Sequence, residues 1–256
     1  MSYPRVERGE GVPVPGRMGW PGVGAALLAG WHLGPAATWL PPVRALTPAL
    51  AGRGRADHVA LTFDDGPSAE STPELLRVLE AAGVRATFFM VGERLARRPG
   101  IGRAVADAGH EVAVHGFEHR YLLGRSPWHV HADLARARDL VGDITGTAPR
   151  WFRPPYGVLT GDAALAARLL GLRPVLWTAW GRDWTPAASP RSVEDTIAPG
   201  IRGGATLLLH DAGYDAAPGA WRSAVGALAG VIDRAQALGY RVGPLAEHGV
   251  GVRRRG

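Results

Sequence analysis

Two adjacent carboxylates, Asp64 and Asp65, follow the short apolar run HVALTF at residues 58–63. Neighbouring side chains at the end of a strand point in different directions. One carboxylate can therefore bind a metal ion while the other accepts a proton from a water molecule. Asp-Asp-Gly-Pro is also a sequence that favours a simple turn. We prefer the chemical interpretation because ionisable residues follow several later strands as well.

Two histidines, His115 and His119, lie four positions apart after the apolar run at residues 111–114. If the backbone turns helically there, both imidazoles lie on one side, as two ligands of one metal ion require. Two histidines and one carboxylate leave coordination positions for water and substrate, which is typical of a catalytic site. The chain has no cysteine, so thiolate ligands are excluded. Zinc is the first expectation, and cobalt, nickel, manganese or iron suit the same ligands.

Three further residues are candidates for the same chemistry. Arg153, in FRPPYG, precedes two prolines that stiffen its loop. A guanidinium there can fix a carboxylate through a bidentate bond, and the rigid loop can aim a backbone N–H at a developing oxyanion. His210 ends the run TLLLH and is a candidate general acid, which a carboxylate such as Asp183 would orient and charge.

The other histidines are interpreted as structural or solvated, because an isolated histidine is more often either of these than a ligand. They are His32, His58, His110, His129, His131 and His248.

The elements that must position these residues alternate between short strands and helices from Asp57 onward, the rhythm of a parallel sheet with crossover helices. Capping signals mark the helix starts, among them a predicted capping box at Ser71. The predicted strands cover residues 58–63, 86–91, 111–114, 151–152, 173–177, 206–210 and 240–242.

About seven such units predict a single-domain, TIM-barrel-like α/β fold, a deformed (β/α) barrel, rather than an open doubly wound sheet. The candidate residues fall at the C-terminal ends of the predicted strands, which share one face of a barrel. The glycine-rich first turn of a dinucleotide-binding fold is absent, which disfavours a nicotinamide or flavin enzyme.

Composition supports one large domain: the chain has 256 residues, of which 46% are hydrophobic. All 29 Lys+Arg positions are arginine, and the formal net charge is +6. A basic chain of this kind favours anionic partners, but the arginines are scattered along the sequence instead of forming a stripe. Nucleic-acid binding is therefore disfavoured.

The N-terminal segment, residues 1–55, is apolar from residue 19 to 43 but is interrupted by His32 and by prolines. Its uninterrupted part is shorter than the roughly 20 apolar residues of a membrane-spanning helix. An anchor, a signal peptide and a cap over the barrel remain alternatives. Membrane attachment or export is slightly favoured over a cytoplasmic location, and the barrel domain is expected at residues 56–250.

The ordered motifs TFDDGP, HGFEH, FRPPYG, GRDW and LLLHD resemble those of the polysaccharide deacetylase family, the NodB homology domain, over about residues 57–242. The resemblance implies a deformed (β/α) barrel of about seven strands and the hydrolytic removal of acetyl groups from N-acetylated sugars, such as chitin oligomers or peptidoglycan-type polysaccharide.

The same resemblance implies particular roles for individual residues. Asp64 would be the general base, held by Arg153, and Asp65, His115 and His119 would bind the metal. His210 would be the general acid, tuned by Asp183, and the backbone N–H of Tyr156 would stabilise the oxyanion. Trp184, Leu208 and Pro155 would contact the substrate, with Trp184 and Leu208 lining the pocket for the acetyl methyl group.

Two positions depart from the family pattern. Gly116 stands where the family usually has Ser or Thr, and Trp180 stands where it commonly has Asp. Two alternatives therefore remain open: a hydrolase of small non-peptide amides or O-acetyl esters, and a non-catalytic, metal-containing sugar-binding protein.

Overall fold

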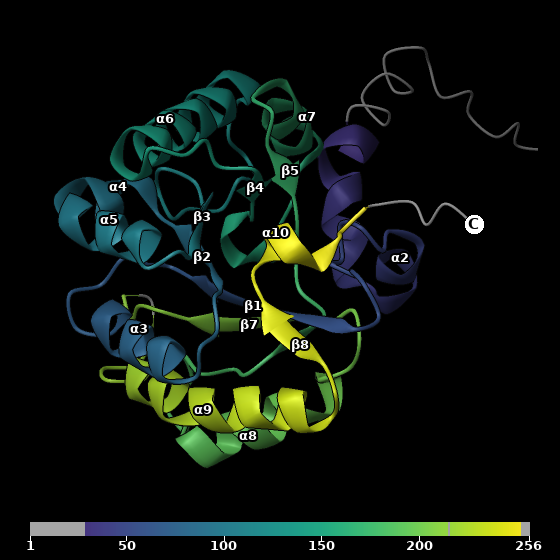
Figure 1. Cartoon of the computed structure of the whole chain (residues 1–256). Coiled ribbons are helices and arrows are strands. Elements are labelled where there is room, and N and C mark those ends of the chain that lie inside the picture. The colour runs from purple at the N-terminus through teal and green to yellow at the C-terminus, as the bar shows by residue number, and fades with distance from the viewer. Residues whose placement is uncertain (1–28, 215, 252–256) are drawn as a thin grey trace, which may run out of the picture.

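A computed structural model describes residues 29–214 and 216–251 (Figure 1). Within these residues, eight strands form one sheet in the order β5-β4-β3-β2-β1-β7-β6, with β8 also paired to β1. Every strand pair in the sheet is parallel. The sheet curls into a deformed barrel with helices on its outer side, as the sequence predicted.

The central strand is β1 (His58–Asp64), which is buried along its whole length. Around it lie β2 (Thr87–Met90), β3 (Glu111–Val114), β4 (Trp151–Phe152), β5 (Arg173–Pro174), β6 (Ala179–Trp180), β7 (Thr206–His210) and β8 (Arg241–Gly243). The outer helices are α3 (Thr72–Ala81), α4 (Gly92–Arg97), α5 (Pro99–Asp107), α6 (Pro127–Thr145), α7 (Gly161–Leu169), α8 (Pro190–Ile197) and α9 (Trp221–Ala237). The short α10 (Leu245–His248) follows β8 and lies at the middle of the view in Figure 1.

The register of the sheet aligns the ends of its central strands. Asp64 is the register partner of His210 on β7 and of Phe89 on β2. Because the strands are parallel, their C-terminal ends open on the same face. The fully buried Leu61, Phe63 and Phe88 pack with residues of the surrounding helices, whereas Ala60 and Phe89, their neighbours along the strands, belong to a separate buried cluster.

One predicted strand is wrong. Residues 173–177 form only the two-residue β5, and a separate strand, β6, begins at Ala179. The backbone between them has other partners: the N–H of Leu176 donates to the carbonyl of Leu50 at 2.7 Å, and the carbonyl of Leu176 accepts a bond from Arg153 at 2.9 Å. Because these backbone groups of Leu176 bond to residues outside the neighbouring strands, β5 and β6 are not one continuous strand.

Three helices begin with a side-chain cap. Ser126, Thr160 and Ser189 each accept a hydrogen bond from a backbone N–H in the first turn of α6, α7 and α8. The capping box predicted at Ser71 is wrong, because the Ser71 side chain makes no capping bond. Its hydroxyl instead donates to the backbone carbonyl of Asp211 at 2.6 Å.

The predicted N-terminal segment lies partly outside the described residues, which begin at residue 29. The described part contains η1 (Gly34–Trp39) and α2 (Pro41–Leu46). The chain then joins the barrel beside β7, where the Thr206 hydroxyl donates to the carbonyl of Gly52 at 2.6 Å. Within residues 29–214 and 216–251, no helix has the length and apolar character needed to span a bilayer.

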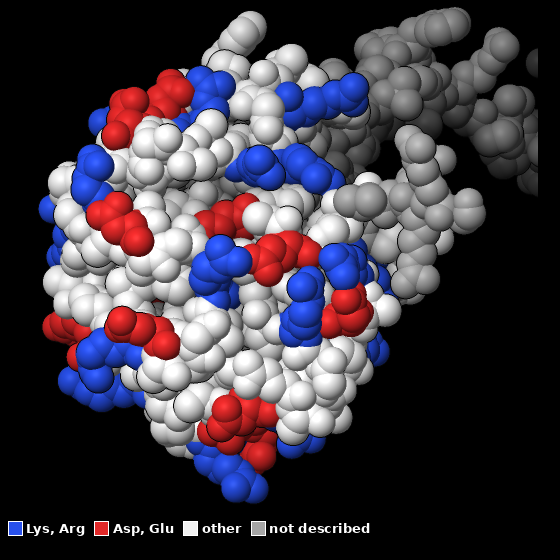
Figure 2. Space-filling model, viewed as in Figure 1, with Lys and Arg blue, Asp and Glu red and all other residues white. Residues whose placement is uncertain are grey.

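Charged side chains of both signs are interspersed on the face shown in Figure 2. Several arginines of the described chain are paired with acids. Arg55 lies 2.6 Å from Asp57, and Arg85 lies 2.5 Å from Glu247.

Candidate active site

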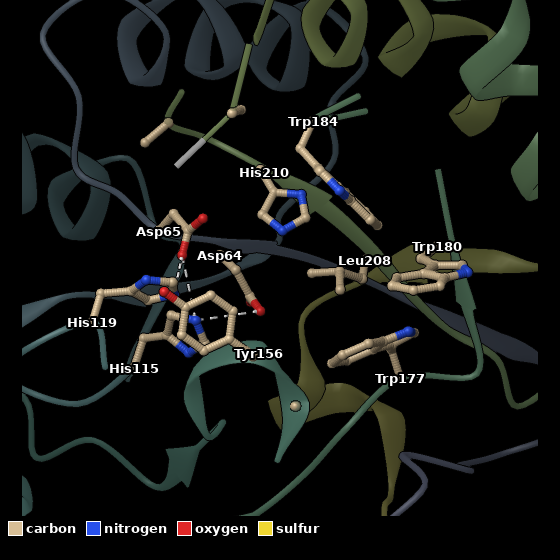
Figure 3. A pocket seen from close by; sticks show the side chains of 13 residues that line it. Asp64, Asp65, His115, His119, Tyr156, Trp177, Trp180, Trp184, Leu208 and His210 are labelled. Atoms are coloured by element: carbon tan, nitrogen blue, oxygen red, sulfur yellow. Dashed lines mark ion pairs between the residues drawn. The ribbon is translucent and has the colours of Figure 1, made fainter. Parts of the chain in front are cut away.

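A cavity of about 230 Å³ opens at the C-terminal ends of the central strands. Figure 3 shows that one side carries the carboxylates and histidines, and the opposite side carries indole rings. The residues that line it are Asp64, Asp65, His115, His119, Tyr156, Gly157, Trp177, Trp180, Trp184, Leu208, His210, Ala212 and Ala216.

The three predicted metal ligands meet in this cavity. Oδ1 of Asp65 lies 3.0 Å from Nε2 of His119 and 3.4 Å from Nε2 of His115. One donor atom from each residue lies within 4.8 Å of the others. Ligands about 2.1 Å from a tetrahedral ion are separated by roughly 3.4 Å, so the spacing fits one divalent cation.

The electrostatics of Asp65 also fit a cation. Its Oδ1 is buried and receives no well-formed hydrogen bond from the described residues. Burial alone would raise the pKa of Asp65, but the facing imidazoles of His115 and His119 hold it well below its usual value. The carboxylate is therefore charged and directed at the two imidazoles, a donor set that suits zinc and its neighbours in the first transition series.

Two of the predicted metal ligands, His115 and Asp65, are each positioned by a hydrogen bond with a buried arginine residue. Nδ1 of His115 donates to the backbone carbonyl of Arg153 at 2.7 Å, which fixes the tautomer that presents Nε2 to the cavity. The buried Arg94 donates to the backbone carbonyl of Asp65 at 2.6 Å. Asp65 has a φ of 81°, so this bond supports a backbone conformation that non-glycine residues rarely adopt.

The loop between His115 and His119 differs from the prediction. The backbone after β3 does not turn helically, because residues 115–119 form a bend that Gly116 enters with a φ of 80°. The carboxylate of Asp133 on α6 accepts the backbone N–H groups of Phe117 at 2.8 Å and Glu118 at 3.0 Å. The loop therefore takes its support from α6 and not from a hydroxyl at position 116.

Gly116 and Asp133 are also sterically matched. A Cβ at position 116 would lie 3.2 Å from Oδ2 of Asp133 and 3.1 Å from the carbonyl of Glu118. Sequence reasoning missed Asp133, since nothing in the spacing of an acid on a later helix shows which loop it meets.

Asp64 lies beside the metal ligands but has a different partner. Nη1 of Arg153 donates to Oδ1 of Asp64 at 2.6 Å. The second oxygen of Asp64 lies 3.8 Å from Nε2 of His115. The expected bidentate bond is absent among the described contacts, because Nη2 of Arg153 donates to the carbonyl of Leu176 instead.

Arg153 itself is fully buried. It also donates to the hydroxyl of Thr62 at 2.9 Å, and its guanidinium lies 4.0 Å from the ring centroid of Phe89. Burial lowers the pKa of Arg153, and the facing Asp64 carboxylate opposes that shift. Such a fixed guanidinium holds one face of Asp64 while leaving Oδ2 on the cavity side.

His210 is held by Asp183 through two bonds. Nδ1 of His210 donates to Oδ1 of Asp183 at 3.0 Å, and the backbone N–H of His210 donates to Oδ2 at 2.7 Å. Burial alone would lower the pKa of His210, but Asp183, together with Asp65 and Asp64, raises it to about 10. The ring is therefore a charged group with its other nitrogen available to the cavity.

The predicted substrate contacts divide into two groups. Trp184 and Leu208 line the cavity, and the ring of Trp184 packs edge-on to His210 with centroids 5.2 Å apart. Tyr156 also lines it, with a φ of 58°. Pro155 is buried and is not among the cavity-lining residues, and its contact with substrate stays a prediction.

Two further indoles, those of Trp177 and Trp180, complete the apolar wall. Their centroids lie 5.6 Å apart, and that of Trp180 lies 4.9 Å from Trp184. Trp180 is the position at which the sequence departs from the family pattern. The spacing of tryptophans in LWTAWGRDW was the signal that could have predicted this wall.

The histidines interpreted as structural lie outside the cavity lining. The rings of His58 and His248 meet through their Nδ1 atoms at 2.9 Å, and Nδ1 of His110 accepts the backbone N–H of Ala86. His32 pairs with Asp162 at 2.7 Å.

Comparisons with known proteins agree with this geometry. Residues 51–175 match the family model described as polysaccharide deacetylase. The chain is 38% identical over 199 residues to a chitooligosaccharide deacetylase of Bradyrhizobium sp. (strain ANU 289), covering 74% of this chain and 89% of that protein. It is 34% identical over 154 residues to the peptidoglycan-N-acetylglucosamine deacetylase PgdA of Listeria monocytogenes, covering 60% of this chain but only 32% of PgdA.

Solved structures share the fold. A peptidoglycan N-acetylglucosamine deacetylase superposes with a TM-score of 0.72 at 28% identity, over 78% of this chain and 92% of that one. A pseudoenzyme of carbohydrate esterase family CE4 from Bacillus anthracis superposes with a TM-score of 0.70 at 25% identity, over 77% of this chain and 67% of that one. The barrel alone therefore does not distinguish active from inactive relatives, and the side chains of the site must do so.

Proposed function

Because this chain belongs to the polysaccharide deacetylase family, we propose that it is a metal-dependent hydrolase that removes acetyl groups from N-acetylated sugars, such as chitin oligomers or peptidoglycan-type polysaccharide. The observation that carries the proposal is one cavity that joins a three-residue metal site to a buried carboxylate and a partly buried histidine, each with its own partner. These groups are Asp65, His115 and His119, then Asp64, then His210.

Zinc is the proposed ion at Asp65, His115 and His119, with cobalt, nickel, manganese and iron as alternatives for the same ligands. When bound, such a cation acts as a Lewis acid that polarises the amide carbonyl and stabilises the negative charge that develops on its oxygen.

Asp64 is the proposed general base. Arg153 occupies Oδ1, so Oδ2 is the oxygen that takes a proton from the attacking water. The bond from Arg153 also fixes the orientation of the carboxylate, so that Oδ2 stays on the cavity side.

His210 is the proposed general acid. Asp183 holds Nδ1, so the proton on Nε2 is the one delivered to the departing amine nitrogen. A histidine that is charged by a neighbouring carboxylate carries this proton before the reaction begins.

The remaining cavity residues orient the substrate. We propose that the acetyl methyl group packs against Trp184 and Leu208, which are apolar residues of the lining, Trp184 in edge-on contact with His210. The backbone N–H of Tyr156, on the loop that follows Arg153, is the proposed donor to the oxyanion.

Two rivals make different predictions. A non-catalytic sugar-binding protein needs neither Arg153 on Asp64 nor Asp183 on His210, and the presence of both pairs favours a hydrolase. A hydrolase of small amides or O-acetyl esters would use the same groups, so it differs only in its substrate.

The test is acetate release by the zinc- or cobalt-loaded protein from chitin oligomers, peptidoglycan fragments, acetylxylan and small amides. We expect release from the N-acetylated sugars, with turnover lost in Asp64→Asn. Activity on acetylxylan or small amides alone would replace the proposed substrate class. Sugar binding without acetate or ammonia release from any substrate would favour the non-catalytic protein.

A further inference from the structure

Tyr121 lies just outside the cavity that Tyr156 and His119 line. Its side chain is 54% exposed, a large fraction for an aromatic residue. Its ring is nonetheless ordered by contact, because it stacks on Tyr156 with centroids 3.9 Å apart and ring planes 15° from parallel. The ring of Tyr156 in turn lies 4.6 Å from that of His119. Three rings therefore run in sequence from the metal ligands to the protein surface.

The backbone on both sides of this stack is fixed. Tyr156 has the left-handed φ of 58° on the loop stiffened by the two prolines after Arg153. The loop that carries Tyr121 is bound to α6 at its start, where Asp133 accepts the N–H groups of Phe117 and Glu118. A ring that is held in place before binding loses little conformational entropy when a ligand packs on it.

The surroundings of Tyr121 suit a ligand with one apolar face and polar edges. Glu118 is bridged by Arg120 at 3.2 Å and by Arg125 at 3.3 Å, so the loop that carries Tyr121 also carries charged groups on both sides of it in the sequence. A pyranose ring matches this pattern, since its C–H groups pack on a flat aromatic face while its hydroxyls point to the edges.

We propose that Tyr121 forms a binding subsite for a second sugar ring, next to the unit whose acetyl group is removed. A ligand that reaches both the metal ligands and the exposed part of Tyr121 must extend past Tyr156, so it is an oligosaccharide and not a monosaccharide. This inference rests on the proposed function and narrows its substrate class to linear oligomers or polymers of N-acetylated sugars.

The experiment measures kcat/KM for acetate release along a series of N-acetylglucosamine oligomers, from the monosaccharide to the hexasaccharide. For the wild-type protein, kcat/KM rises once the oligomer is long enough to reach Tyr121. Tyr121→Ala reduces that rise roughly 3- to 10-fold, the size of one aromatic contact, and leaves the shortest substrate unaffected. Tyr121→Phe retains the rise, because it keeps the ring.

Leu123→Ala is the matched control, because Leu123 is an exposed apolar residue of the same loop, 40% accessible. A merely structural effect of Tyr121 on Tyr156 would lower kcat/KM equally at every length, and that result would overturn the inference. An unchanged length profile in Tyr121→Ala would overturn it too, while leaving the proposed function intact. A wild-type protein that releases acetate from no sugar would remove the proposed function, and the subsite with it.

Discussion

Nη1 of Arg153, a fully buried residue, donates to Oδ1 of Asp64 at 2.6 Å. Oδ1 of Asp65, the next residue, lies 3.0 Å from Nε2 of His119 and farther, at 3.8 Å, from Nη1 of Arg94. The two adjacent carboxylates therefore have different nearest partners, an arginine for Asp64 and an imidazole for Asp65. Because their partners differ, we propose Asp64 as the proton acceptor and Asp65 as a metal ligand.

Asp64→Asn tests this assignment of roles. The asparagine oxygen can still accept a bond from Arg153, so the fold and the three metal ligands are expected to persist. The loss of the proton acceptor should lower kcat by about 10²- to 10⁴-fold while zinc content stays at the wild-type level. Acetate-release kinetics and atomic absorption on the same preparation measure both quantities. Full activity in this variant would show that another group is the base.

Asp133→Asn probes the support of the metal-binding loop. Phe117 and Glu118 donate to different oxygens of Asp133, and asparagine replaces one of these oxygens with an NH₂ donor, so His119 should be held less firmly. The affinity for zinc, measured by competition with a chromogenic chelator, is expected to fall about 10-fold or more. Asp139→Asn is the control, because Asp139 is an exposed acid of α6 that pairs with Arg138. Equal affinities in the two variants would contradict the account.

Trp180→Ala removes the middle indole of the apolar wall. Trp180 touches neither Asp64 nor His210 in the described contacts, so its loss should act on binding more than on the chemical step. We expect KM for a chitin oligomer to rise several-fold and kcat to change by less than about 3-fold. A large fall in kcat at constant KM would instead indicate that the indole positions the reacting amide.

The paired histidines below the barrel predict acid sensitivity. Burial, and then the neighbouring His58, lower the pKa of His248 to about 4, and burial also lowers the pKa of His58. In the unfolded chain a histidine binds its proton near pH 6.5. The unfolded state therefore binds more protons between about pH 6.5 and 4, so stability is complete above this window and is lost as the pH falls through it.

We expect the free energy of unfolding, from urea titrations at pH 7.5 and pH 5, to fall by on the order of 1–2 kcal/mol from these two histidines. His248→Gln should be less stable than the wild type at pH 7.5 but should lose less stability on acidification. A variant with the same pH dependence as the wild type would mean that other groups cause the acid sensitivity.

Local sequence signals predicted most of the barrel. Ser126, Thr160 and Ser189 cap helices through bonds to nearby residues, and such bonds depend only on neighbours in the chain. The placement of Asp64 beside His210 follows from a parallel sheet whose strands end together. These features needed no knowledge of distant contacts.

The wrong predictions of local structure have a common cause. Each of the residues concerned has a hydrogen-bond partner far away in the chain. Ser71 turns from its helix to the carbonyl of Asp211. Leu176 leaves its predicted strand because its backbone bonds Leu50 and Arg153.

For the loop that carries His115 and His119, the sequence predicted one feature correctly and another wrongly. Their spacing correctly brought His115 and His119 to one place, but the predicted helical turn was wrong. The bend depends on Gly116 and on a carboxylate of α6, Asp133, which no periodicity connects to it. Short-range spacing therefore selected the two histidines that meet in the candidate metal site, and a long-range contact decided the backbone that carries them.

The central claim is that Asp65, His115 and His119 hold one divalent cation. The most direct measurement is the zinc content of wild type, His119→Ala and His129→Ala after dialysis against a weak chelator, with circular dichroism to confirm folding. His129 is an exposed histidine at the start of α6 and serves as the control. The account predicts one zinc per chain in the wild type and in His129→Ala, and little zinc in folded His119→Ala. Full zinc occupancy in folded His119→Ala would contradict it.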